Sequence, residues 1–159
     1  MVWLHGGGFS TGSANEAQYD GENLSRSGDV VVVSVNHRLN VFGQSGGGAK
    51  VLALMTSPYA EGLFDKGIVQ SGATETMGVR FNTQESSTAL TGNILDILGI
   101  TAENIEDIQT VPAAELQAAA QQALQQTGEE LQISAALGGG YSMDWEPVVD
   151  GDFLPTDPV

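Results

Sequence analysis

Asp29-Val30-Val31-Val32-Val33-Ser34-Val35 is the stretch that decides the fold class of this chain. Its β-branched residues favour a strand, and four valines in a row leave no alternation between an apolar and a polar face. A strand of this kind is typical of a parallel sheet that helices cover on both faces. The stretch therefore predicts an α/β fold with a mostly parallel sheet and flanking helices.

Two further pieces of that fold lie on either side of the valine strand. Met1-Val2-Trp3-Leu4 predicts a buried strand that leads into the glycine loop His5-Gly6-Gly7-Gly8-Phe9. Downstream, the G-x-S-x-G pattern Gly43-Gln44-Ser45-Gly46-Gly47 precedes a helix predicted over 49–55, which ends before Pro58. The order of sharp turn and helix is the one that a nucleophile elbow requires.

The serine and the glycine loop together indicate acyl transfer. A serine hydroxyl becomes a good nucleophile when a neighbouring base takes its proton, and the tetrahedral intermediate needs preorganised donors for its charge. Ser45 would supply the nucleophile, and the loop would supply backbone N–H groups. A phosphate-binding loop over 43–50 is the poorer interpretation, because Ala49 separates Gly48 from Lys50 and Val51 stands where Ser or Thr would bind magnesium.

Composition limits the partners. The chain has 159 residues and a formal charge of −15, and Arg80 is its last basic residue, so nucleic acid and anionic membranes are poor candidates. It contains no cysteine, which excludes disulfides and thiolate chemistry, and no apolar run approaches the roughly 18 residues of a membrane span. These features favour a cytoplasmic location.

The second half predicts mainly helices. We expect a single partial domain with a sheet core over 1–80, peripheral helices over 81–141 and a hairpin over 142–159. The segments behind this expectation are a short strand at 66–70, a helix marked by Leu90, Ile94, Ile97 and Leu98, a shorter helix marked by Ile105 and Ile108, a helix from Pro112 to about Gln126, and a hairpin over Pro147–Pro155 that turns at Asp150-Gly151.

Four segments in this order resemble the type-B carboxylesterases, the α/β-hydrolases that include para-nitrobenzyl esterases and cholinesterases. The resemblance implies a partial α/β-hydrolase fold that hydrolyses a small carboxylic ester through an acyl-enzyme on Ser45. It implies an oxyanion hole made by Gly7, Gly8 and Gly46, a place for Phe9 in the substrate pocket, and no metal or organic cofactor. The four segments are Val2–Phe9, Asn36–Leu39, Phe42–Gly47 and Pro147–Gly151.

The chain departs from this family in three ways. Parallel strands need a crossover of about a dozen residues, but only 36–42 separate the valine strand from the elbow, so a block looks deleted near Val41 and Phe42. The family has further strands before the one at Met1. Its catalytic acid and histidine follow the Pro147 hairpin, beyond Val159. We therefore expect an incomplete or internally deleted member of the family.

The chain is not expected to complete a triad by itself. His5 precedes the glycine loop, and His37 is interpreted as a strand-end residue. Glu146, Asp150 and Asp152 are assigned to turns and solvent, because an acid is of little use without a histidine to orient. The alternative to an esterase is a catalytically inactive fragment or a protein-interaction module of the same fold, and its exposed sheet edges would favour self-association.

Overall fold

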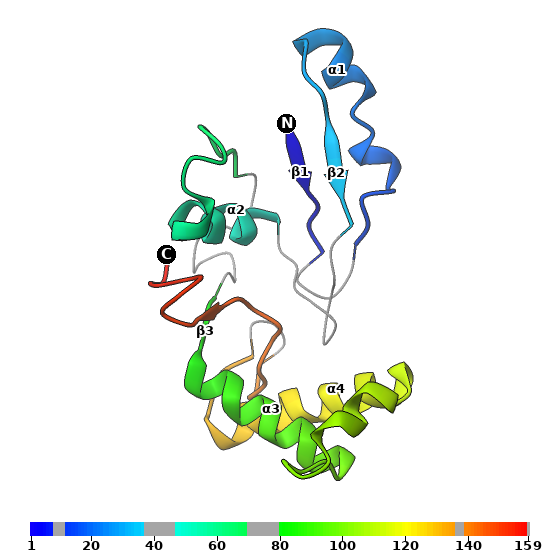
Figure 1. Cartoon of the computed structure of the whole chain (residues 1–159), viewed down its shortest axis with the longest axis vertical. Coiled ribbons are helices and arrows are strands. Elements are labelled where there is room, and N and C mark those ends of the chain that lie inside the picture. Colours follow the sequence, from blue (N-terminus) through cyan, green and yellow to red (C-terminus); the bar gives the residue numbers. More distant parts are fainter. Residues whose placement is uncertain (8–11, 37–46, 70–79, 136–138, 159) are drawn as a thin grey trace. The chain divides into compact units, whose positions relative to one another are not determined.

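The chain forms two compact units in the computed structural model, which describes residues 1–7, 12–36, 47–69, 80–135 and 139–158 (Figure 1). The first unit combines Met1–Phe81 with Trp145–Val159, and the second is Asn82–Asp144. The second unit overlaps the segment 81–141 that was expected to be helical. The single-domain organisation stays a prediction.

The first unit contains β1 (Val2–Leu4), η1 (Ala17–Tyr19), α1 (Glu22–Gly28), β2 (Val33–Val35), α2 (Gly47–Thr56), η3 (Pro58–Ala60) and β4 (Val148–Val149).

β1 and β2 pair in parallel, with Val2 opposite Val33 (Figure 1). The N-terminal ammonium of Met1 donates to the Val31 carbonyl at 2.7 Å, so the pairing continues past the strand end. Parallel neighbours cannot be joined by a tight turn, and here η1 and α1 form the crossover. The prediction of an α/β fold with parallel strands is confirmed.

Two strand predictions differ from the structure. β2 begins at Val33 rather than at Asp29, because Asp29 adopts a left-handed conformation (φ 50°) that ends α1. Val31 is 76% exposed and Val33 49%, so the described residues do not cover both faces of this two-stranded sheet as expected. Residues 66–69 form no strand, and Gln70, the end of that predicted strand, lies outside the described residues.

α2 is the helix that the sequence predicts after the G-x-S-x-G pattern. It ends at Thr56, two residues before Pro58, which cannot continue a helix. Ala49 is buried on α2 and packs against Phe81 and Trp145. α2 also packs against β1, so it is fixed to the strand that leads into the glycine loop.

The segment after β4 forms a turn built on the side chain of Asp150. Its Oδ1 accepts from the backbone N–H groups of Asp152 at 3.0 Å and Leu154 at 2.9 Å, and Gly151 has φ 79°. These bonds lower the pKa of the Asp150 carboxyl. A turn was predicted here, but no second strand follows within 150–158, so the hairpin predicted for 142–159 is not formed in the described residues.

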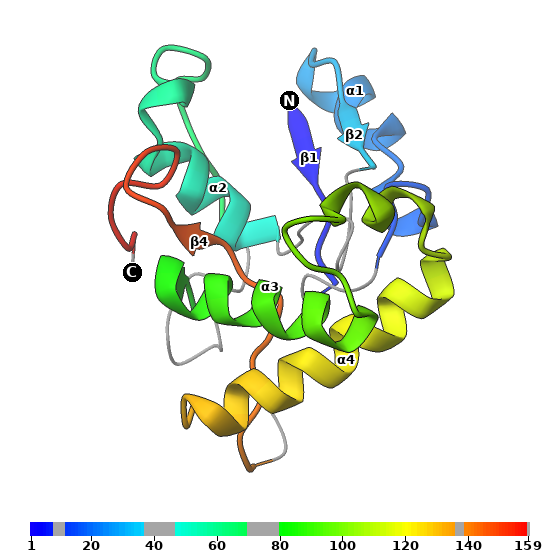
Figure 2. The ribbon, with the colours of Figure 1, turned by 60° about the horizontal axis from the view of Figure 1, so that its bottom comes forward.

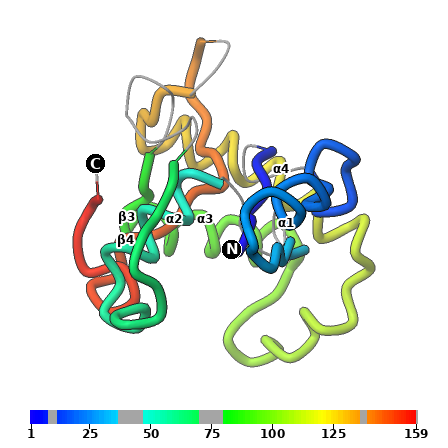
Figure 3. Tube along the Cα trace, turned by 90° about the horizontal axis from the view of Figure 1, so that it is seen from above, coloured from blue at the N-terminus to red at the C-terminus, as the bar shows by residue number. Residues whose placement is uncertain are grey.

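Tyr59 of η3 contacts this turn. Its hydroxyl donates to Asp152 Oδ1 at 2.8 Å, and its ring stacks on Phe153 with centroids 5.9 Å apart. Figures 2 and 3 show the C-terminal segment, in red, beside the segment that follows α2. The hydrogen bond to Asp152 and the carboxylate charge raise the pKa of the Tyr59 phenol.

The second unit consists mainly of two capped helices. The Thr83 hydroxyl accepts from the Ser86 N–H at the start of one, and Gly99 ends it with φ 68°. The other follows Pro112 as predicted and extends to Glu130, past the predicted end. The unit contains β3 (Asn82–Thr83), α3 (Gln84–Leu98), η5 (Ile105–Thr110) and α4 (Ala113–Glu130).

α3 and α4 pack against each other (Figure 2). Between them, Asn93 donates from Nδ2 to the Thr127 hydroxyl at 2.9 Å. Gly128 of α4 lies against the backbone of Ser142, so closely that a Cβ at 128 would overlap it. The helical predictions for this half are confirmed. The buried faces of the two helices carry Leu90, Ile94, Ala119, Ala120, Ala123 and Leu124.

Candidate active site

The glycine loop begins where β1 ends, and its first side chain, His5, is buried, with 1% of its surface exposed. His5 Nδ1 lies 2.7 Å from the Gly6 carbonyl oxygen. Because a carbonyl only accepts, this contact requires the proton on Nδ1. Gly7 follows with φ 122°, a conformation that favours glycine. His5 was expected only to precede the loop, whereas in the structure its ring supports the loop through the Gly6 carbonyl.

Gly12 packs on the outer side of the same loop. A Cβ at position 12 would lie 2.7 Å from His5 Nδ1 and would overlap the Gly6 carbonyl, and the φ of Gly12 is 104°. Both the space and the backbone conformation therefore require glycine at this position. The Gly6 carbonyl is held between the imidazole and the Gly12 backbone.

The N-terminus of α2 lies against the end of β1. A Cβ at Gly47 would be 2.5 Å from the Leu4 carbonyl oxygen, so helix and strand backbones approach as closely as glycine allows. Lys50, in the first turn of α2, donates from Nζ to the His5 carbonyl at 3.4 Å. The glycine loop and the helix that follows the serine pattern are thus brought together across more than 40 sequence positions.

Lys50 contacts the glycine loop, and sequence reasoning did not single it out as a candidate site residue. Its side chain is half-buried, and burial lowers its pKa from the usual 10.5 to about 8. The signal available in the sequence was a cation in the first turn of a helix, where the macrodipole disfavours positive charge. The interpretation of Lys50 as part of a phosphate loop had used only its spacing.

Four predicted site residues lie outside the described residues, namely Gly8, Phe9, Ser45 and Gly46, and so does His37, which was interpreted as a strand-end residue. Of the proposed oxyanion donors, Gly7 is described, and it stands at the loop that contacts α2. The roles of Ser45, Gly7, Gly8 and Gly46 stay predictions.

The three candidate acids have different surroundings. Asp150 and Asp152 lie in the exposed turn after β4, as expected. Glu146, by contrast, is buried, with 8% of its surface exposed, so its assignment to solvent was wrong. It follows Trp145, which packs on α2.

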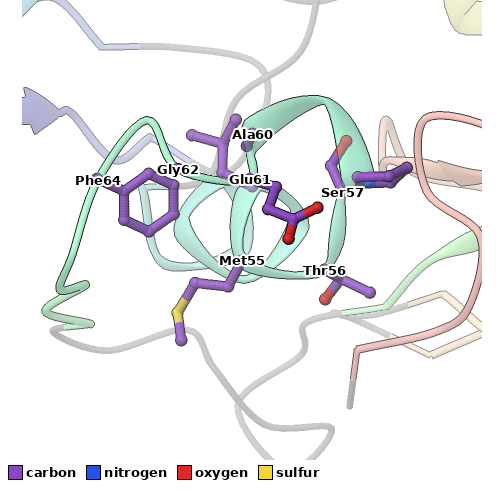
Figure 4. Close-up of a pocket in the computed structure, with 9 residues that line it drawn as sticks. Met55, Thr56, Ser57, Ala60, Glu61, Gly62 and Phe64 are labelled. Atoms are coloured by element: carbon purple, nitrogen blue, oxygen red, sulfur yellow. The ribbon is translucent and has the colours of Figure 1, made fainter.

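A hollow of about 360 Å³ opens at the opposite end of α2 (Figure 4). Figure 4 shows Met55 and Phe64 on one side, Thr56 and Ser57 on the other, and Glu61 between them. At about 1.5 Å per residue, the C-terminus of α2 is roughly 13 Å from Gly47. The hollow is therefore separate from the glycine loop.

In the described part of the chain, none of the helices is both long and apolar enough to cross a membrane. The same part holds no group of three histidine or acidic side chains that could bind a metal ion.

Comparison with known proteins connects this geometry to one family. The model of the carboxylesterase family matches residues 1–43 and 40–159. The para-nitrobenzyl esterase of Bacillus subtilis is 30% identical over 203 aligned positions that cover 99% of this chain, and carboxylesterase 3 of Pongo abelii is 30% identical over 201 positions that cover 99%. Among solved structures, a PNB esterase matches with a TM-score of 0.78 at 28% identity, and a Geobacillus stearothermophilus carboxylesterase with a TM-score of 0.74 at 28% identity. Each match covers 99% of this chain and 40% of the solved one.

These matches also locate a gap. The chain spans 39% of the length of the Bacillus subtilis relative and 32% of that of the Pongo abelii relative. The first alignment has 203 positions, whereas this chain has 159 residues, so the relative holds residues without a counterpart here. The two segments matched by the family model meet at 40–43. This is where the short crossover predicts a deleted block.

Proposed function

The chain belongs to the carboxylesterase family, and on that premise we propose that it carries the nucleophile and oxyanion half of a carboxylic ester hydrolase. Ser45 would attack the carbonyl carbon of a small ester, and the alcohol would leave as the acyl-enzyme forms. Water would then release the acid. The N–H groups of Gly7, Gly8 and Gly46 would receive the oxyanion in both steps.

The observation that carries this proposal is the contact between the glycine loop and α2. An oxyanion hole needs donors from two segments on one carbonyl oxygen. The two segments are in contact here. A Cβ added at Gly47 would lie 2.5 Å from the Leu4 carbonyl oxygen, and Lys50 donates to the His5 carbonyl. Gly46, the third proposed donor, directly precedes Gly47 in the sequence.

A histidine and an acid outside this chain would activate Ser45. Of the two histidines here, His5 is occupied with the Gly6 carbonyl. Loss of the histidine from such a triad costs on the order of a millionfold in turnover, while the oxyanion hole and binding leave roughly 10³ to 10⁴ over water. We therefore expect feeble ester hydrolysis from the chain alone.

The test is labelling by a fluorophosphonate probe, beside turnover of p-nitrophenyl butyrate and a Ser45→Ala control. Labelling of the wild type that is lost in the control is the expected result. Equal labelling of both would place the reactive group elsewhere and reject Ser45 as nucleophile. No labelling of either would favour the second candidate, a catalytically inactive member of the fold.

The second candidate is a module for protein contacts, including contacts between copies of this chain. It is favoured by the exposed apolar side chains of the two-stranded sheet, where Val2 is 64% exposed and Val33 49%. An uncovered strand edge is a template for pairing with another chain. Sedimentation of the purified chain tests this, since a monomer over a wide concentration range would reject pairing.

A further inference from the structure

Lys50 occupies a place that local physical rules disfavour. Its ammonium lies in the first turn of α2, where the helix dipole repels a cation, and it is half-buried. Residues that break a local rule are typical of functional sites. One contact of Lys50 is with the backbone of the glycine loop, at the His5 carbonyl.

That contact bears on the direction of the loop's N–H groups. The described peptide bonds are trans, and in a trans peptide the C=O and the following N–H point in opposite directions. Lys50 holds the His5 carbonyl, and so it sets the direction of the Gly6 N–H. The His5 imidazole holds the Gly6 carbonyl, and so it sets the direction of the Gly7 N–H. Two successive peptides are thus oriented by side chains.

We propose that Lys50 is a positioning residue of the oxyanion loop: it ties the His5 carbonyl to α2 and so fixes the residue whose imidazole, through the Gly6 carbonyl, directs the N–H of Gly7 toward the reacting carbonyl. This role rests on the proposed function, because it takes Gly7 as an oxyanion donor. Lys50 acts through the backbone of His5 and Gly6. Gly12 packs against the Gly6 carbonyl and the His5 ring, whereas Lys50 contacts the His5 carbonyl.

The charge of Lys50 gives the tether a pH dependence. With a pKa of about 8, Lys50 is a charged donor below pH 8 and a neutral, weaker donor above it. Other groups on the segments around α2 titrate as well, so the test must separate them from Lys50. The titratable side chains on the segments packed against α2 include His5, Tyr59, Glu61, Asp65, Lys66, Arg80 and Glu146.

The experiment compares wild type, Lys50→Arg, Lys50→Met and Lys66→Met in the full chain. Lys66 is the other lysine of the chain and is exposed, so its variant is the matched control. The NMR signals of the Gly6 and Gly7 α-carbons are followed from about pH 6.5 to about pH 9.5. Carbon signals are used because amide protons exchange with water too fast at the upper end of this range. Fluorophosphonate labelling is measured on the same samples.

We expect both glycine signals of the wild type and Lys66→Met to shift with a midpoint near pH 8. Lys50→Met should move these signals, remove the pH step and slow labelling about tenfold, less than the 10²–10³ lost with an oxyanion donor itself. Lys50→Arg should keep the wild-type signals at neutral pH without the step, since arginine stays charged.

A wild type without a step near pH 8 would overturn the proposal, as would a step that persists in Lys50→Met. Neither result requires ester hydrolysis. The wild-type titration decides the matter even if Lys50→Met does not fold. If the glycine signals respond as expected while no chain is labelled, the positioning role is supported and the esterase proposal fails.

Discussion

The close approach of α2 to β1 can be tested with Gly47→Ala. The added Cβ would lie 2.5 Å from the Leu4 carbonyl oxygen, where ordinary contacts begin at 3.4 Å. Because that oxygen belongs to the backbone, a strand or a helix must move. Overpacking of this kind costs about 1–3 kcal/mol, and the helix propensity of alanine returns up to about 1 kcal/mol. We expect a net loss of about 1–2 kcal/mol in unfolding free energy.

Tryptophan fluorescence is the appropriate assay, because Trp3 and Trp145 both belong to the first unit. The expected loss lowers the midpoint of thermal unfolding by roughly 2–8 °C. Gly92→Ala is the matched control, since a Cβ there meets nothing within 4 Å and the residue lies inside α3. A Gly47→Ala variant as stable as the wild type would refute the tight contact. The displaced helix should also slow any labelling of Ser45.

Three further changes test other contacts. Thr83→Ala removes the N-cap of α3 and should cost about 1 kcal/mol, as measured by urea unfolding followed by circular dichroism; an unchanged midpoint would contradict the cap. Gly128→Ala places a Cβ in the Ser142 backbone and should cost about 1–3 kcal/mol by the same assay, so a neutral effect would refute that packing. Asp152→Asn should lower the pKa of Tyr59 toward 10, read from phenolate absorbance. The raised pKa means that this bond stabilises the fold below pH 10, and that the stabilisation is lost as pH rises through the pKa of Tyr59. A Tyr59 titration that is the same in Asp152→Asn as in the wild type would exclude the bond.

Local patterns predicted the elements whose causes are local. The spacing of Leu90 and Ile94 gave α3, and Pro112 gave the start of α4, because periodicity and caps act within a few residues. The parallel pairing of β1 and β2 followed from the unbroken valines. The extent of β2 did not follow, since the left-handed Asp29 shortens it.

Features that depend on hydrogen bonds between a side chain and the backbone were not predicted. Asp150 accepts two backbone N–H groups that a hairpin would have used, so the turn forms without a second strand. Lys50 and His5 act through contacts that only the folded chain creates. The motifs identified the family and the candidate chemistry. The contacts of Lys50 and His5 that support the glycine loop could be seen only in the folded structure.

The two glycine contacts at the loop have a consequence for directed evolution. Gly12 and Gly47 have no room for a side chain, so a mutagenesis library that varies them mostly yields destabilised clones. Position 50 differs, because it already carries a half-buried side chain that contacts the His5 carbonyl. A library that fixes the two glycines and varies position 50 would tune the loop with few clones lost.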